Sequence, residues 1–532
     1  RVDENGLVNY AEVLGGEDVV NGDFSNGLTG WVGNPETTLS VSNNELDIQS
    51  SSAASQYGTA FSNVNFELGK QYIVQLTVVS CNNPSQIRIG GSTSATAYSQ
   101  NIWASGDIGI GTHSKLYTPS QNYAYLAIGG RNDVTTLVID NVSVKQVDRD
   151  NVPRIDYTGG GCPHILAEPE RTNLFTYSED FSQWDTFNSA SYSSNAIISP
   201  DGTQNADKLI IGLANTSPFI LENNSIISGQ YYTQTIYAKV GDAEILQITG
   251  SSGFSTEFQN YNLSNGTLGN NDVTGTTTSS IENVGNGWYR CIYTSIATST
   301  VLGRIVFAIV NVGGGRISGS GLLSNTGIYI WGAQLEVGSY PTSYIPTSGS
   351  TVTRNQDIFT RDGIGSLINS TEGVLFVEMA ALANDLTDRY IMLSDGGWNN
   401  RIQLNYENVS NTIEARVFVG SFEQFDTSFV LTDITLNNKF AIKWKVNDFA
   451  LWVNGVEVDT DSSGSVPSAN TLNELSFKDG QGSNNFFGKV KQLQVYDTSL
   501  TDNQLIQLTG EAGTHFFESY AEMAEALTYT IQ

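Results

Sequence analysis

The sequence predicts an all-β fold, with three β-sandwich modules in series and a short C-terminal helical segment. Apolar and polar residues alternate over short stretches such as 71–79 and 440–446, and this period of two is typical of strands with one buried face. Clusters of Gly, Asn, Ser and Asp, among them 82–84 and 313–315, separate the stretches at a spacing that favours sandwiches over βαβ units. At about 150 residues per domain, the 532 residues allow three or four domains.

Charge and hydropathy exclude several classes of function. The chain has 25 Lys and Arg against 54 Asp and Glu, a formal charge of −29, and phosphate backbones and anionic membrane surfaces repel such a chain. We therefore expect no nucleic acid partner. No run of about 18 apolar residues occurs, which predicts no membrane insertion. Cys81, Cys162 and Cys291 lie far apart without a C-x-x-C pair, so we expect free, buried thiols rather than a disulfide framework or a zinc ribbon.

An internal repeat divides the first two thirds of the chain into two related modules. Asp-Phe-Ser followed by Trp opens both, in 21–31 and in 176–184. A strand beginning with Gly and Gln-Tyr comes next, and each segment closes on a similar strand, at 137–144 and at 328–337. The repeat predicts two jelly-roll sandwiches. We place them, after a lead-in segment at 1–15, at residues 16–147 and 148–355.

Residues 356–510 follow a different pattern, that of successive hairpins. Val453-Asn-Gly-Val456 contains the Asn-Gly pair that a type I′ turn requires. After the last predicted strand, Thr501-Asp-Asn-Gln504 forms a capping box before two leucines and a glycine stop. A second helix is predicted over 516–527, because its apolar residues share one face. It lies in a C-terminal helical tail, residues 511–532.

The module boundaries and the connecting stretches resemble known families. Residues 21–24 and 139–144 resemble the opening and closing strands of a carbohydrate-binding-module jelly roll of the family 4/9 type. The third module resembles concanavalin A-like (laminin G-like) domains. The connecting stretches resemble a set of phrases that recur in bacteriophage virion proteins. These phrases occupy residues 1–8, 151–157, 162–174 and 332–346.

The resemblance implies a phage virion appendage, a tail fibre or a similar adhesion protein, that presents glycan-binding sandwiches to the host cell surface. Localisation in the extracellular phage particle, contacts with other virion proteins and a homotrimer follow from it. In such proteins the first phrase runs almost directly into the second, so residues 15–148 resemble an insertion. The chain begins at Arg1 without a leader, which predicts a processed or truncated product. A capsid-decorating or head-fibre protein and a surface-polysaccharide depolymerase remain alternatives.

Aromatic rings beside polar loops are the candidates for sugar binding, because a ring stacks on the apolar face of a sugar while Asn, Gln and Asp bond its hydroxyls. Trp398, Trp31 and Trp103 each lie beside Gly-, Asn- or Asp-rich sequence, and Trp398 is the best placed. Packing in a core is the alternative for each of them. The remaining tryptophans in or beside strand-like runs are expected in the cores: Trp288, Trp331, Trp444 and Trp452.

Calcium is the most reasonable ion, since oxygen ligands are plentiful and sulfur and imidazole are scarce. Jelly rolls of the family 4/9 type commonly hold a structural calcium between their opening and closing strands, and the resemblance implicates Asp23 and Asp140. The alternative is that both aspartates cap turns.

The sequence contains no recognisable catalytic centre. Glu45-Leu-Asp47-Ile-Gln49 is the nearest match to the carboxylate motif of concanavalin A-like glycanases, but its third position is an amide and it lies in the first module. His113, His164 and His515 have no neighbouring ligand or triad residue. We therefore expect adhesion without turnover, and no enzyme.

Overall fold

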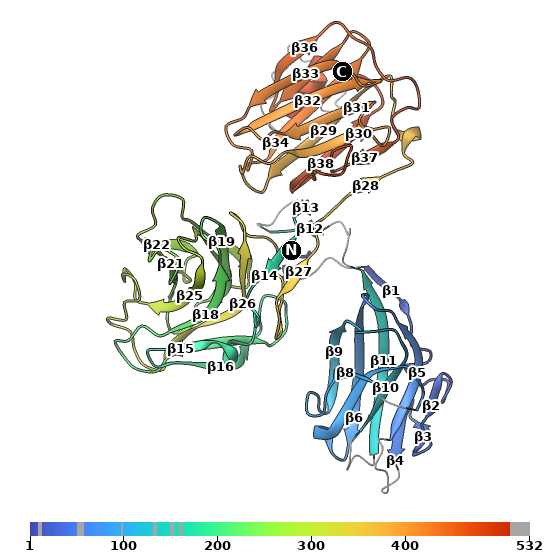
Figure 1. Ribbon diagram of the computed structural model, residues 1–532, viewed down its shortest axis with the longest axis vertical. Coiled ribbons are helices and arrows are strands. Elements are labelled where there is room, and N and C mark those ends of the chain that lie inside the picture. Colours follow the sequence, from blue (N-terminus) through green and yellow to red (C-terminus); the bar gives the residue numbers. More distant parts are fainter. Residues whose placement is uncertain are drawn as a thin grey trace, which may run out of the picture. The chain divides into compact units, whose positions relative to one another are not determined.

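The computed structural model contains three β-sandwiches in two compact units (Figure 1). The units are Glu12–Val152, and Arg1–Ala11 joined to Pro153–Gln532. Strands are the predominant secondary structure of both, which confirms the all-β prediction. No helix in the described part of the chain is long and apolar enough to cross a membrane. The structure describes residues 1–8, 13–50, 58–96, 99–130, 136–148, 154–158 and 163–510.

The unit Glu12–Val152 is one sandwich of two antiparallel sheets. Its core forms where alternate strand residues meet between the sheets, for example Val74, Leu76 and Val78. One sheet contains, in spatial order, β3 (Thr37–Ser42), β4 (Glu45–Ser50), β11 (Thr136–Asp148), β6 (Gln71–Cys81) and β9 (Gly111–Tyr117), with β1 (Val13–Glu17) paired to β11. The other contains β2 (Trp31–Gly33), β5 (Thr59–Phe66), β10 (Tyr123–Gly130), β7 (Ile87–Ser92) and β8 (Gln100–Trp103).

The second unit begins with a middle sandwich of two six-stranded sheets. One contains β15 (Asp185–Phe187), β18 (Phe219–Ile226), β25 (Val301–Val310), β20 (Ile245–Ser251), β21 (Phe258–Asn262) and β22 (Thr267–Asn271). The other contains β16 (Ala190–Ile197), β17 (Ala206–Ile211), β26 (Gly327–Val337), β19 (Tyr231–Lys239), β24 (Trp288–Ile296) and β23 (Thr278–Gly285). A separate pair, β14 (Arg171–Asn173) and β27 (Val352–Arg354), links the start and the end of this sandwich.

The third sandwich has a seven-stranded and a six-stranded sheet. The first contains β12 (Arg154–Asp156), β13 (His164–Ala167), β38 (Gly488–Tyr496), β29 (Glu372–Ala381), β34 (Asn438–Lys445), β35 (Phe449–Val453) and β36 (Val456–Asp461). The second contains β28 (Thr360–Arg361), β37 (Glu474–Ser476), β30 (Arg389–Ser394), β31 (Arg401–Tyr406), β32 (Thr412–Val419) and β33 (Phe422–Val430). The helix α1 (Asp502–Thr509) follows the last strand, with the predicted capping box between Thr501 and Gln504. The predicted helix 516–527 lies outside the described residues.

The connecting phrases have a different position from the one we expected. We placed residues 148–355 in the second module, but β13 pairs with β38 and so extends a sheet of the third sandwich. The segment 1–8 packs on the middle sandwich, where Val2 and Val8 join its buried aromatic residues. The second unit therefore combines the phrases with two sandwiches rather than assigning each phrase to one module.

The segments that precede and follow the unit Glu12–Val152 in the sequence are hydrogen-bonded to each other. The backbone N–H of Val2 donates to Asp156 Oδ1 at 2.8 Å, and that of Tyr157 donates to the carbonyl of Val2 at 2.9 Å. Adjacent entry and exit points are what an inserted domain needs. Autonomous folding of the insertion stays a prediction.

The internal repeat extends to single hydrogen bonds. Asp23 Oδ1 accepts bonds from the backbone N–H and the hydroxyl of Ser25, and Asp180 Oδ1 accepts the same two bonds from Ser182. The phenylalanine and tryptophan of each opening pack with ring centroids 5.3 and 5.4 Å apart, in the pairs Phe24–Trp31 and Phe181–Trp184. The first and the middle sandwich are therefore two copies of one local design.

Candidate functional site

The outer face of the β30–β33 sheet gathers polar side chains in cross-strand rows. Strand residues alternate between the faces, so Ile402 and Leu404 enter the core while their neighbours point outward. Side chains in cross-strand register lie side by side. The register gives three outward rows: Tyr390, Asn405 and Glu414; Met392, Gln403, Arg416 and Asp426; and Ser394, Arg401 and Phe418.

Ion pairs connect Arg416 with Glu414 and Asp426 on this face. Arg416 Nη2 lies 2.6 Å from Glu414 Oε1, and Arg416 Nε lies 2.9 Å from Asp426 Oδ1. Next to them, Gln403 Nε2 donates to Asn405 Oδ1 at 2.7 Å. Burial raises the pKa of Glu414 to about 7, although the Arg416 charge opposes the shift. Glu414 is thus a carboxyl that changes its charge close to neutral pH.

The guanidinium of Arg401, in the next row of this face, lies against two aromatic rings. The Cζ atom of Arg401 lies 3.5 Å from the ring centroid of Phe418 and 4.4 Å from that of Trp398. Arg401 Nε donates to Gln403 Oε1 at 2.8 Å, and Nη1 donates to the carbonyl of Trp398. The Tyr390 ring stands edge-on to Trp398, with centroids 6.1 Å apart. Burial, with the charge of Arg416, lowers the pKa of Arg401 to about 10.

The loop 395–400, which carries Trp398, is fixed by hydrogen bonds of its own side chains. Asp395 accepts from the backbone of Gly397 at 3.1 Å and from Asn400 Nδ2 at 2.8 Å. Asn400 Oδ1 accepts in turn from the backbone of Gly420, in the β32–β33 turn, at 2.9 Å. The Trp398 ring therefore has a preformed position at the edge of the polar face.

The structure brings only one of the three predicted tryptophans to this face. Trp398 is half-buried there. Trp31 and Trp103 are 4% and 5% exposed and lie in the core of the first sandwich. Their ring faces are covered by apolar neighbours, which agrees with the core alternative and counts against sugar stacking. The four tryptophans expected in cores, Trp288, Trp331, Trp444 and Trp452, are buried.

The two aspartates proposed for calcium are engaged in local hydrogen bonds. Asp23 accepts from Ser25, and Asp140 accepts from the backbone and the side chain of Asn141 at 2.7 and 2.8 Å. Among the residues that the structure describes, no group of three or more His, Cys, Asp or Glu side chains could hold a metal. These bonds favour the turn-capping alternative for both aspartates.

Other predicted features are structural. Glu45 and Asp47 lie on β4, where Asp47 accepts from Gln49 at 2.8 Å, and Nε2 of His113 lies 2.8 Å from the carbonyl of Gly109. Cys291 is buried, but Cys81 is only half-buried, so the prediction of buried thiols was wrong for Cys81, which lies at the end of β6. Cys162 and His515 lie outside the described residues.

The middle sandwich covers polar side chains of β20 and β21 with the loop 311–323. Gln247 Oε1 accepts from the backbone of Ile317 at 2.7 Å, and Asn260 Nδ2 donates to the carbonyl of Gly314 at 2.7 Å. Ile317 also packs on the apolar residues of β25 and β20. Loop 311–323 therefore satisfies the polar side chains of β20 and β21 within the protein.

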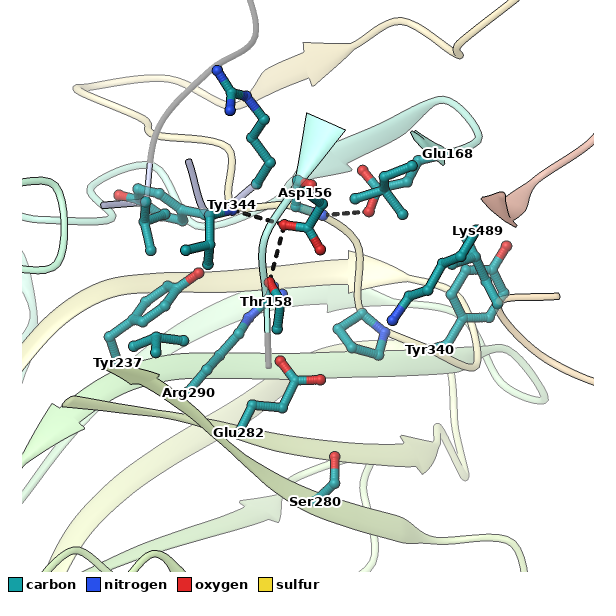
Figure 2. A pocket seen from close by; sticks show the side chains of 18 of the residues that line it. Asp156, Thr158, Glu168, Tyr237, Ser280, Glu282, Arg290, Tyr340, Tyr344 and Lys489 are labelled. Carbon is teal, nitrogen blue, oxygen red and sulfur yellow. Dashed lines mark hydrogen bonds between the residues drawn. The ribbon is translucent and has the colours of Figure 1, made fainter. Parts of the chain in front are cut away.

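A cavity of about 230 Å³ lies beside the connecting phrases (Figure 2). Asp156, Glu168 and Glu282 line it together with Arg290 and Lys489. Figure 2 shows these side chains converging from the phrases, from the sheet below and, for Lys489, from β38. Arg1 also lines the cavity, so three acidic and three basic side chains face it, and its charge favours no particular class of ligand.

Comparison with known proteins gives distant likenesses only. No family model matches the chain, and no curated protein matches it. The carbohydrate-binding module CBM40 of the Ruminococcus gnavus IT-sialidase shares 15% sequence identity over 29% of this chain and 99% of that chain, with a TM-score of 0.25. The CBM22-1-CBM22-2 tandem of Paenibacillus barcinonensis Xyn10C shares 10% over 62% and 100%, with a TM-score of 0.23. Domains LG4-5 of the mouse laminin alpha1 chain share 11% over 54% and 89%, with a TM-score of 0.20. At these values the likenesses say nothing about ligand or function.

Proposed function

We propose that the outer face of the β30–β33 sheet binds a glycan without cleaving it. The observation that carries this proposal is the preformed pairing of an aromatic edge, Trp398 and Tyr390, with the partly accessible guanidinium of Arg416 and carboxylate of Asp426. Rings stack on sugar faces, and such polar groups bond sugar hydroxyls. Gln403 and Asn405 are fully or almost fully buried, so they do not contact a ligand themselves but fix the orientation of Arg401 from below.

The wider proposal is an adhesion protein of the phage virion, a tail fibre or a similar appendage exposed on the particle. It rests on the four connecting phrases, which resemble those of virion proteins. Assembly as a homotrimer, contact with other virion proteins and a host cell-surface glycan as ligand belong to the same proposal. Several weak sites in one assembly would gain avidity of about 10²–10⁴ over a single site. Imaging of labelled virions distinguishes a tail appendage from a capsid-decorating protein.

Cleavage of a surface polysaccharide is the second candidate function, and Glu414 is the observation that favours it. A carboxyl with a raised pKa can act as a general acid, with Asp426 as a second carboxylate on the same face. The ion pair of both groups with Arg416 favours binding instead. Release of reducing sugar from host polysaccharide, abolished in Glu414→Gln, would establish the enzyme.

The proposed binding site is tested with Trp398→Ala in the full chain. We expect at least a tenfold loss of binding to host cells and to their isolated surface polysaccharide, because the stacking ring is removed. The melting temperature should change little, since the ring is half-buried on a loop. Tyr192→Ala, which removes an aromatic ring that is 37% exposed on the middle sandwich, is the matched control and should bind normally. Unchanged binding by Trp398→Ala would remove this face from consideration.

A further inference from the structure

Arg401 is a buried cation without an ionic partner. The residue is 6% exposed, yet no carboxylate of the described residues lies within ion-pair distance of its guanidinium. Its two recorded hydrogen bonds go to neutral acceptors, Gln403 Oε1 and the carbonyl of Trp398. An uncompensated buried charge is costly, and proteins ordinarily pair it.

Three other buried or partly buried arginines of the same unit are paired, whereas Arg290, 8% exposed, resembles Arg401 in donating to neutral acceptors, the hydroxyl of Thr235 and the carbonyl of Thr342. The guanidinium groups of Arg154, Arg354 and Arg389 each lie within 2.7 Å of a carboxylate oxygen. Arg416, the neighbour of Arg401 on the same face, is neutralised by Glu414 and Asp426. The face thus contains carboxylates that could have paired with Arg401, but they are held by Arg416.

The surroundings leave one edge of the Arg401 guanidinium for a ligand. The rings of Phe418 and Trp398 lie against the guanidinium, while Nε and Nη1 donate to acceptors within the protein. Nη2 has no acceptor among the described residues, and it is not one of the enclosed polar atoms. Contact with the two rings restricts the guanidinium, and its planar fork favours directional recognition of an oxyanion.

We propose that Arg401 binds the carboxylate of an acidic sugar whose ring stacks beside Trp398. The inference rests on the proposed glycan-binding function and names its ligand class. A carboxylate is the fitting anion, because it is planar, like the guanidinium fork, and carries a single charge. The nearby carboxylates of Glu414 and Asp426, and the net charge of −29, would repel a phosphate dianion more strongly.

The test compares matched ligands that differ in charge. Trigalacturonic acid is compared with its methyl ester, and sialyllactose with lactose, by calorimetric titration of the full-length chain. The first pair represents uronic acids and the second represents nine-carbon acidic sugars. We expect at least one acidic member to bind at least tenfold more tightly than its neutral counterpart. Equal affinity within both pairs, or no binding of either acidic member at millimolar concentration, would overturn the inference.

Two variants separate ligand recognition from folding. Arg401→Gln should abolish the preference for the acidic member, and Arg401→Lys should reduce it, because lysine keeps the charge but loses the planar fork. Arg304→Gln, an exposed arginine of the middle sandwich, makes the same charge change and should keep the preference. Melting curves check that Arg401→Lys is folded, and a folded Arg401→Lys with the full preference of the wild type contradicts a directional contact.

The same experiment distinguishes failure of the inference from failure of the proposed function. If Trp398→Ala weakens binding to host polysaccharide but the wild type does not discriminate between the paired ligands, the glycan-binding proposal stands and the acidic-sugar inference is wrong. A chain whose host binding is unaffected by both Trp398→Ala and Arg401→Gln loses both.

Discussion

Two regions of the second unit bury guanidinium groups, and they differ in whether carboxylates neutralise the charge. In the joint, defined as Arg154, Glu168, Arg354 and Asp357, both arginines meet Glu168 Oε2 at 2.7 Å, and Arg154 also pairs with Asp357. The carboxylate Oε1 of Glu168 accepts from the backbone of Ser343 at 2.9 Å. On the outer face of the β30–β33 sheet, Arg401 has aromatic and neutral neighbours instead.

The difference separates a structural role from the proposed binding role. A buried charge network whose members are all satisfied fixes the chain segments that supply it. The joint takes its residues from β12, β27 and the segments that adjoin them, so it holds the connecting phrases against both sandwiches. A buried cation without an ionic partner contributes little to that purpose and gains most from an external anion.

Removing the central carboxylate of the joint is expected to have the largest effect. Glu168→Gln leaves Arg154 and Arg354 with one neutral partner in place of an anion, and breaking a buried pair in this way costs about 3–5 kcal/mol of unfolding free energy. Glu170→Gln, two residues further on and exposed, is the control and should change stability by less than about 0.5 kcal/mol. Denaturant unfolding of both variants measures the difference.

The acid limb of the same measurement gives a second criterion. Burial opposes the ionisation of Glu168, but Arg154 and Arg354 outweigh it and lower the pKa of Glu168 below its ordinary value. A carboxyl with a lowered folded-state pKa stabilises the protein above its unfolded pKa of about 4.5, and this contribution is lost as the pH falls below it. Glu168→Gln should therefore flatten the decline of stability below pH 4.5. A variant as stable as wild type at pH 7 would contradict the role of the joint.

Glu414 on the binding face should produce an intermediate effect of opposite sign. Its pKa is raised to about 7 by burial, with Glu407 and Asp426 acting in the same direction and Arg416 against them. The folded state therefore holds the proton more tightly than the unfolded chain, and stability falls as the pH rises from about 4.5 to 7. After screening by solvent we expect about 1 kcal/mol, or about 2–4 °C in melting temperature.

The pH effect is measured as a difference between two proteins. Glu414→Gln cannot ionise, so its melting temperature should fall less than that of wild type between pH 5 and pH 7.5. Taking the difference cancels the groups that both chains share. Parallel curves for the two proteins would show that Glu414 titrates at its ordinary pKa.

The sequence predicted most of the fold but only part of the binding face. Period-two alternation and the turn residues gave the strand-rich sandwiches, because these signals act locally. The capping box at Thr501 was correct for the same reason. The pairing of β13 with β38 joins residues more than 300 positions apart, and no local pattern specifies such a partner.

Among the aromatic candidates, the sequence could not separate loop from core. Trp31 lies beside glycines, as Trp398 does, but the Asp-Phe-Ser opening turns it inward onto Phe24. The polar row of β31 did carry a signal, since Arg401, Gln403 and Asn405 alternate with Ile402 and Leu404. Period two indicates which residues share a face. Whether Arg401 has an ionic partner depends on which arginine pairs with Glu414, and only the three-dimensional register of the strands determines this.

The smallest expected effect concerns calcium in the first sandwich, and the repeat supplies the argument. Asp23 and Asp180 make the same two bonds to Ser25 and Ser182. The closing strands also correspond, with positive φ angles at Asn141 and Gly332, but Trp331 precedes Gly332 where Asp140 precedes Asn141. The middle sandwich therefore has the opening carboxylate, Asp180, without a carboxylate at the corresponding position of its closing strand. An aspartate that caps a turn in both copies needs no ion in either.

We accordingly expect excess chelator to shift the melting temperature of the full-length chain by less than about 1 °C. An ion that binds only the folded state, at a concentration of 100 times its dissociation constant, would contribute about 2.7 kcal/mol to stability. Its removal would lower the melting temperature by several degrees. Asp23→Asn and Asp180→Asn should each cost about 1 kcal/mol, because each weakens one turn cap, and the two losses should be equal whether calcium is present or not. A chelator-sensitive loss that is confined to Asp23→Asn would establish the ion and break the correspondence between the two copies.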